Sequence, residues 1–299
     1  MHEVKKVRNA IIVGMPRSGT SLAAAIFVNK NYRVVVGARR DLLPRNEANP
    51  FGYWEAESMN NHNAAILGAA GFPFHNTWMF DRIQPEQAKR IYDLSPLPEH
   101  MRYLQAFEQH GPWVWKDPRF CYTLAYWWPM MNPKTTGVLL VRRASGAIVR
   151  SFNRLDWRRP LAQGSDDFYA RIGDHLEAAM GAIRSFDIPY LEIDYEEFVD
   201  APDRVARRLS NFFGISLITA DLNVQLALNH SSWRGRLSGA LRSATRALPV
   251  RAKRALARIV PQTVMEVVYP EKKLTRNAKD LEVVVSVADA SLSGVTGHR

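Results

Sequence analysis

The sequence contains a single cysteine, Cys121, among its 299 residues. One thiol excludes an internal disulfide framework and any zinc or iron–sulfur centre built from several cysteines. The eight histidines include no H-E-x-x-H motif and no close pair at helical spacing, so sequence spacing predicts no histidine-based metal site. Long apolar runs are also missing, because no stretch reaches the roughly eighteen uncharged residues that a membrane-spanning helix needs.

The first residues are not expected to form a signal peptide. A basic start leads into an apolar run at 10–13, which is the order found in a signal peptide. That run is too short, however, and Pro16 and Arg17 interrupt it. The sequence therefore predicts a cytoplasmic protein, with peripheral contact to the inner membrane face as an additional option.

Acidic residues are few relative to basic ones. The 29 Asp and Glu against 40 Lys and Arg give a net charge of +11, which favours polyanionic partners. Eight basic residues fall within 222–265, a stretch without Asp or Glu. Pro249 there predicts the first turn of a basic amphipathic helix. Either the stretch 237–260 contacts an anionic membrane or glycolipid through this helix, or the helix packs by its apolar side. The second option is favoured.

Short apolar strands alternate with helices along the chain, which predicts an α/β fold. Strands are expected at 10–13, 33–36, 113–115, 137–141 and 190–193. Helices are expected at 20–29, 55–70, 166–185 and 202–213. Two more are expected, one that starts after Pro85 and one that follows Arg143 and ends at about residue 155. The pattern predicts a three-layer sandwich with a central, mostly parallel sheet at 1–229. A basic, mostly helical extension at 230–299 is expected to pack on this domain or continue it.

A loop of the phosphate-binding type lies between the first strand and the first helix. From Gly14 to Ser21 it reads G-M-P-R-S-G-T-S, with the spacing of the nucleotide-binding loop G-x-x-x-x-G-K-[ST]. Thr20 stands where that loop has the lysine that reaches the β- and γ-phosphates, and the positive charge has moved to Arg17. We therefore expect phosphate binding without triphosphate hydrolysis. A plain glycine turn is the alternative.

The segment Pro16-Arg17-Ser18-Gly19-Thr20 resembles the 5′-phosphosulfate loop of the sulfotransferases, especially the bacterial members. These enzymes have a P-loop-like fold and use 3′-phosphoadenosine 5′-phosphosulfate (PAPS) as sulfuryl donor, releasing 3′-phosphoadenosine 5′-phosphate (PAP). The resemblance extends over about 9–215. It implies that the donor's 5′-phosphosulfate is bound by Arg17, Ser18, Gly19, Thr20 and Ser21.

The family also binds the donor's 3′-phosphate with an arginine after a later strand and a serine eight residues on. Arg143 and Ser151 have this separation after the strand at 137–141. Arg142 stays an alternative, because the family often has Arg-x-Pro at the strand end, and Arg142-Arg143-Ala144 fits that pattern only from Arg142. A capped helix with two exposed arginines is the alternative without a ligand.

Lys116 lies in Trp115-Lys116-Asp117-Pro118-Arg119, which resembles the Lys-Asp-Pro element of bacterial and tyrosylprotein sulfotransferases. The resemblance implies that Lys116 lies beside the transferred sulfuryl group, where its charge would stabilise the transition state. A surface Lys–Asp pair is the alternative.

The candidate base is Glu55, which ends a stretch at 49–55 similar to the N-P-x-G-Y-[FW]-E signature of a bacterial branch. An ordinary carboxylate in a first helical turn is an equal alternative. Asp41 and Glu47 are further candidates for the base.

The expected function is in-line transfer of a sulfuryl group from PAPS to a hydroxyl or amine, without a metal ion. The acceptor classes left open are carbohydrates, glycolipids, peptides and small molecules. The alternative is a P-loop kinase or a nucleotide-binding protein without sulfuryl transfer. A nucleic-acid-binding module is disfavoured, because it leaves three ordered motifs unexplained.

Overall fold

The computed structural model describes residues 7–37, 39–45, 49, 52–72, 84–154 and 165–226. All of these except the last residue belong to one compact unit, Met1–Gln225. The extension at 230–299, its amphipathic stretch at 237–260 and the candidate base Glu47 lie outside the described residues. Among the described helices, none has the length and apolar character to cross a membrane.

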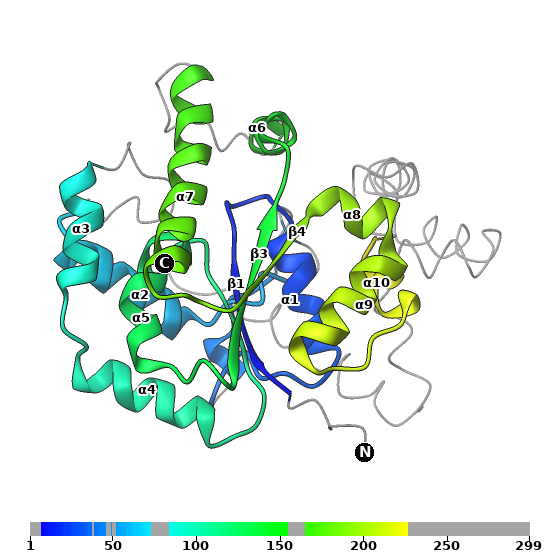
Figure 1. Ribbon diagram of the computed structural model, residues 1–299, viewed down its shortest axis with the longest axis horizontal. Helices are drawn as coiled ribbons and strands as arrows, with labels where there is room; N and C mark the ends of the chain where they lie inside the picture. Colours follow the sequence, from blue (N-terminus) through cyan, green and yellow to red (C-terminus); the bar gives the residue numbers. More distant parts are fainter. Residues whose placement is uncertain are drawn as a thin grey trace, which may run out of the picture. The chain divides into compact units, whose positions relative to one another are not determined.

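Four parallel strands form the central sheet in the order β2-β1-β3-β4 (Figure 1). Their bounds are Asn9–Val13 for β1, Val114–Lys116 for β2, Thr136–Arg142 for β3 and Tyr190–Asp194 for β4. The register pairs Ile12 of β1 with Lys116 of β2 and with Leu139 of β3. Because all strands are parallel, the segments that follow them emerge at one edge of the sheet.

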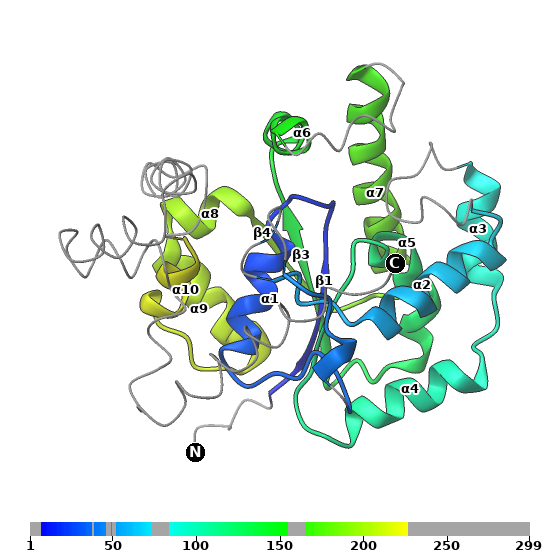
Figure 2. The same cartoon turned by 180° about the vertical axis from the view of Figure 1, so that it is seen from behind.

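Helices cover both faces of the sheet (Figures 1 and 2). On one side lie α1 (Thr20–Val28), α8 (Tyr195–Asp200), α9 (Pro202–Phe213) and α10 (Thr219–Leu226). On the other lie α2 (Glu57–Ala69), α3 (Pro85–Asp93), α4 (Pro98–Glu108), α5 (Phe120–Trp127) and α7 (Ser165–Ser185). Helix α6 (Ser145–Arg154) follows β3, and short 3₁₀ turns span Arg39–Asp41 and Trp128–Met130. The predicted three-layer α/β fold is confirmed.

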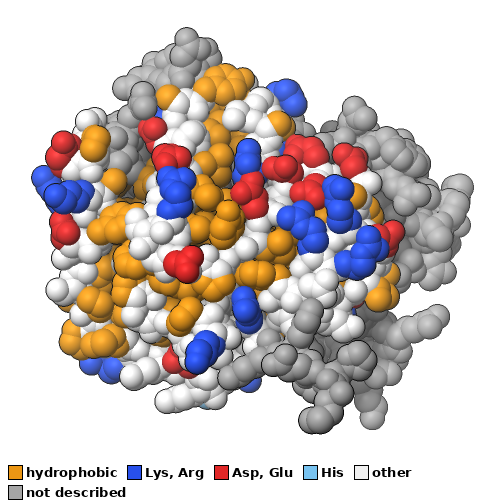
Figure 3. All heavy atoms as spheres, viewed as in Figure 1, with side chains coloured by type: hydrophobic (Ala, Val, Ile, Leu, Met, Phe, Trp, Pro, Cys, Tyr) orange, Lys and Arg blue, Asp and Glu red, His pale blue; other side chains and the backbone are white. Residues whose placement is uncertain are grey.

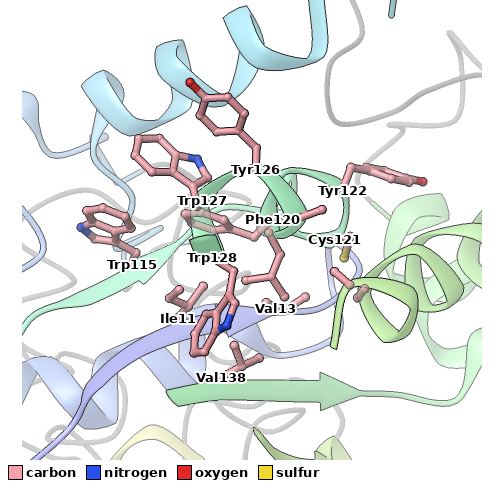
Figure 4. Close-up of a cluster of buried hydrophobic side chains, with 14 of the residues drawn as sticks. Ile11, Val13, Trp115, Phe120, Cys121, Tyr122, Tyr126, Trp127, Trp128 and Val138 are labelled. Atoms are coloured by element: carbon pink, nitrogen blue, oxygen red, sulfur yellow. The ribbon is translucent and has the colours of Figure 1, made fainter. Parts of the chain in front are cut away.

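An aromatic core lies between the sheet and the α2–α5–α7 layer (Figure 4). Trp113, Trp115 and Trp127 are fully buried there with Phe107 and Phe120. Such side chains each bury about 150–250 Å² and dominate the hydrophobic stabilisation of a core. The core includes residues of β2 and α5, so it packs around the elements on both sides of the segment Lys116–Arg119. These tryptophans are therefore packing residues of the core.

Several expected elements differ from the structure. The strand predicted at 33–36 is wrong, because only an isolated bridge joins Arg33 to Trp113. Sequence reasoning also missed α4, α5, α8 and α10. Every residue of α5 is buried, so it shows none of the polar–apolar periodicity that identifies a surface helix.

Candidate functional site

Two glycines shape the loop between β1 and α1. A Cβ atom at Gly14 would lie 2.5 Å from the Val141 carbonyl oxygen. Gly19 has a φ of +103°, and a Cβ there would overlap the ring of Tyr195. Gly14 has no room for a side chain, and Gly19 has neither the room nor a backbone conformation that other residues adopt without strain. The chain can therefore turn directly into α1, whose first N–H groups have no acceptor within the helix and attract anions.

The three side chains expected at the two phosphate groups come together beside this loop. Arg17 Nε donates a hydrogen bond of 3.0 Å to Ser151 Oγ on α6. Arg143 Nη1 donates one of 2.9 Å to the Arg17 carbonyl oxygen. Arg17 and Ser151 are 134 residues apart in the chain, so the fold alone brings them together. The result is a compact site with two guanidinium groups at the end of β1 and β3.

Arg142 points elsewhere. Its guanidinium pairs with Glu192 at 2.5 Å and lies 3.9 Å from Asp194, both on β4, and its side chain is 50% exposed. Figure 3 shows acidic and basic side chains gathered on this face, over β4, α8 and α9. Arg143 follows the strand, and its guanidinium contacts the loop instead.

Tyr195 is a site residue that sequence reasoning missed. It directly follows β4, and its ring packs against Gly19. The Arg143 guanidinium lies 4.2 Å from the centre of the same ring, within the range of a cation–π contact. The ring therefore holds both the glycine of the loop and the arginine after β3. Its position at the carboxyl end of a strand was the available signal.

Lys116 and Glu55 form a buried ion pair at the same edge of the sheet. Lys116 Nζ contacts Glu55 Oε1, and both side chains are less than one-tenth exposed. Lys116 Nζ also donates to Ser21 Oγ at 3.2 Å, and Asn49 Nδ2 donates to that same oxygen at 3.0 Å. Ser21 lies in the first turn of α1, so it connects the phosphate loop to the ion pair.

The environment of Glu55 makes it a stronger base than an exposed glutamate. Burial raises the pKa of Glu55, and the nearby Asp117 raises it further, whereas the Lys116 ammonium and the Asn60 amide oppose this rise. Asn60 Nδ2 donates to Glu55 Oε2 at 3.1 Å. Glu55 precedes α2, which begins at Glu57, so the alternative of a first-turn helix carboxylate is wrong. Buried groups whose pKa is perturbed gather at functional sites.

Asp117 has a different role from its neighbour. Its Oδ2 accepts a hydrogen bond from Asn63 Nδ2 at 2.9 Å, and its Oδ1 accepts from the Arg119 backbone and guanidinium. Asn63 in turn accepts from Thr123 and Trp127. This buried network fixes the turn that follows Lys116. The alternative of a surface Lys–Asp pair is therefore wrong, since both residues are buried with other partners.

Asp41 caps a helix. Its two carboxylate oxygens accept hydrogen bonds from the backbone N–H and the hydroxyl of Ser58, at 2.8 and 2.6 Å. Ser58 is in the first turn of α2, where such an acceptor satisfies a helical N–H group. Of the two described candidates for the base, Glu55 is the one that contacts Lys116.

Ser18 offers a buried polar atom to a ligand. The residue is 1% exposed, and its Oγ has no hydrogen-bond partner among the described residues. A buried hydroxyl without a partner carries a desolvation cost of about 1–3 kcal/mol, which a phosphate oxygen would relieve. The loop thus fits an anionic group.

Comparison with known proteins supports the same interpretation. A family model, the Sulfotransferase family, matches residues 10–219, which is more than half of the chain. The chain belongs to the sulfotransferase family. As a sulfotransferase it is a transferase enzyme, and the loop, Lys116, Arg143 and Ser151 all lie within the matched range.

Two solved structures are similar to this sulfotransferase. The sulfotransferase domain of the Synechococcus PCC 7002 olefin synthase is 17% identical, with a TM-score of 0.41 over 78% of this chain and 81% of that one. Sulfotransferase STF1 of Mycobacterium tuberculosis H37Rv is also 17% identical, with a TM-score of 0.43 over 76% and 72% of the two chains. Among curated proteins, no sequence matches significantly.

Proposed function

We propose that this sulfotransferase takes its sulfuryl group from PAPS, passes it to a hydroxyl or amine of an acceptor and leaves PAP. One observation carries the proposal: Ser21 of the phosphate loop is hydrogen-bonded to Lys116, which pairs with Glu55. The groups suited to holding a phosphosulfate and the groups suited to the chemistry therefore form one continuous site. The proposed acceptor classes are carbohydrates, glycolipids, peptides and small molecules.

The donor would be held at both of its phosphate ends. Arg17, the Ser18 hydroxyl and the first N–H groups of α1 suit the 5′-phosphosulfate. Arg143 and Ser151, which meet Arg17 through hydrogen bonds, suit the 3′-phosphate. Two guanidinium groups in contact with one loop repel each other, so an anion of high charge between them would be bound strongly.

Lys116 and Glu55 would carry the chemistry. As the bond from sulfur to the leaving phosphate oxygen breaks, negative charge grows on that oxygen, and the Lys116 ammonium would stabilise it. As the acceptor oxygen bonds to sulfur, its proton would pass to the Glu55 carboxylate. Burial of the pair excludes water, which strengthens both effects.

A kinase is the rival, and it is disfavoured because Thr20 replaces the loop lysine. Calorimetric titration with PAP, and with ATP in the presence of Mg²⁺, separates the two functions. We expect PAP to bind more tightly than ATP. Tight ATP binding with no measurable PAP binding would overturn the proposal in favour of a nucleoside triphosphate site.

Arg17→Ala should weaken PAP binding by about 10–100-fold, because a hydrogen bond to a charged group contributes roughly 1.5–3 kcal/mol. Calorimetry measures the change. Arg184→Ala is the matched control, since Arg184 pairs with Glu177 on the exposed side of α7. Arg17 would be removed from the site if both variants bound PAP like the wild type.

Arg143→Ala should weaken PAP binding by a similar factor of about 10–100, whereas Arg142→Ala should change it little. The reason is geometric, because Arg142 pairs with β4 and Arg143 contacts the loop. Adenosine 5′-phosphosulfate lacks the 3′-phosphate, so its affinity should respond much less to Arg143→Ala. An equal loss for both ligands would show that Arg143 acts through folding.

A further inference from the structure

His62, Glu99 and His100 meet away from the ion pair, where α2 and α4 pack together. One ligand atom from each of the three lies within 4.8 Å of the others. The two imidazole rings are edge to face, with their centres 4.8 Å apart. The sequence predicted no histidine-based metal site because no two histidines have helical spacing. The fold brings the pair together from two different helices.

His100 is oriented as a metal ligand needs to be. Its ring is 1% exposed, and Nδ1 lies 2.7 Å from the Tyr126 hydroxyl, which accepts a hydrogen bond from the Leu97 backbone N–H. If Nδ1–H donates to Tyr126, Nε2 keeps its lone pair, and a hydrogen bond at the far ring nitrogen is what metal-bound histidines commonly make. Nε2 is buried without a hydrogen-bond partner among the described residues.

The rest of the cluster completes a donor set. Glu99 Oε1 lies 3.7 Å from His100 Nε2, and the Glu99 side chain is 59% exposed. His62 is half-buried, between His100 and the ring of Tyr103.

We propose that His62, Glu99 and His100 bind a divalent transition-metal ion, with Zn²⁺ as the best fit. Two imidazoles and one carboxylate form a known zinc donor set with a fourth position open to water. Tetrahedral Zn²⁺ places its ligand atoms about 3.3 Å apart, so the cluster must contract.

The metal site would join α4 to α2, the helix whose Asn60 is hydrogen-bonded to Glu55 of the ion pair. Along α2, Asn60 binds Glu55 and Asn63 binds Asp117, while His62 packs against α4 residues. A bound ion would therefore stabilise the position of α2. The ion takes no part in the proposed sulfuryl transfer, and the inference does not depend on the identity of the donor.

Titration of the full chain with Zn²⁺ by calorimetry, and with Co²⁺ by visible absorption, tests the site. We expect one tight Zn²⁺ site in the wild type. His62→Gln should lower the Zn²⁺ affinity by about tenfold or more. Glu99→Gln should also weaken Zn²⁺ binding. Because the Glu99 side chain is exposed, this substitution leaves the core intact. His110→Gln is the matched control, because His110 is exposed just after α4.

The outcomes separate cleanly. The proposal holds if His62→Gln and Glu99→Gln both lose affinity while His110→Gln binds like the wild type. It fails if the wild type binds no Zn²⁺, or if all variants bind equally, which would place the ion at other histidines. Circular dichroism of each variant shows whether it is folded. A misfolded His62→Gln leaves the decision to Glu99→Gln.

Discussion

Glu55→Gln should lower kcat by about 10²–10⁴-fold, which is the usual cost of removing a general base. Glutamine keeps the shape and the hydrogen-bonding capacity of the side chain but cannot take a proton. The interaction is made mainly in the transition state, so kcat and kcat/KM should fall together while PAP affinity changes little. The measurement is steady-state kinetics with an acceptor that the wild type sulfates.

Two neighbouring carboxylates serve as controls for this variant. Glu57→Gln, two residues away and exposed in the first turn of α2, should keep near-normal kcat. Asp41→Asn should act mainly on stability, because Asp41 caps α2 through Ser58. If Glu55→Gln stays active and Asp41→Asn loses kcat, the base is Asp41. If both stay active, the acceptor needs no base from the enzyme.

The pH profile gives a second test of Glu55. A base must be ionised to act, so the rate should fall as pH decreases through the pKa of Glu55. Burial raises that pKa above the ordinary value of 4.5, so the acid limb of kcat/KM should lie above it. An acid limb at or below the ordinary value would contradict the assignment.

Lys116→Ala should lower kcat by about 10²–10³-fold, because the charge that forms on the leaving oxygen loses its counter-charge. PAP affinity should change far less. Lys134→Ala is the matched control, since Lys134 is exposed in the turn before β3. Losses of equal size in kcat and in PAP binding would make Lys116 a donor-binding residue and not a catalytic one.

The same variant has a second expected effect, because Lys116 opposes the rise in the pKa of Glu55. Removing the ammonium should move the acid limb of the residual activity to higher pH. The double variant Lys116→Ala/Glu55→Gln should lose less than the two single losses combined, because the residues act as a unit. Strict additivity would show that they act independently.

Local signals in the sequence were sufficient for the sheet and the phosphate loop. Short apolar runs predicted the four strands, together with a fifth at 33–36 that the described sheet lacks. The glycines at 14 and 19 marked a turn whose shape the structure shows to require them. The helix α5 escaped because a helix buried on all sides has no periodicity, and Phe120–Trp127 resembles any apolar segment.

The site depended on information that spacing does not contain. Arg142 and Arg143 could not be separated, because the choice depends on the direction in which each side chain points where β3 ends. Tyr195 belongs to the site through the contacts of its ring with Gly19 and Arg143, which no local pattern in the sequence encodes. The contact of Lys116 with Glu55 joins β2 to a segment 61 residues earlier, a separation that no local pattern encodes.

Incubation with PAPS carrying radiolabelled sulfur, in the presence of carbohydrate, glycolipid, peptide and phenolic acceptors, tests sulfuryl transfer most directly. Labelled sulfur distinguishes this reaction from phosphoryl transfer, which adds nearly the same mass. We predict that the wild type moves the label to one acceptor class with release of PAP in equal amount, and that Lys116→Ala does so far more slowly. PAP binding without transfer of label to any acceptor, or equal transfer by Lys116→Ala, would contradict the account.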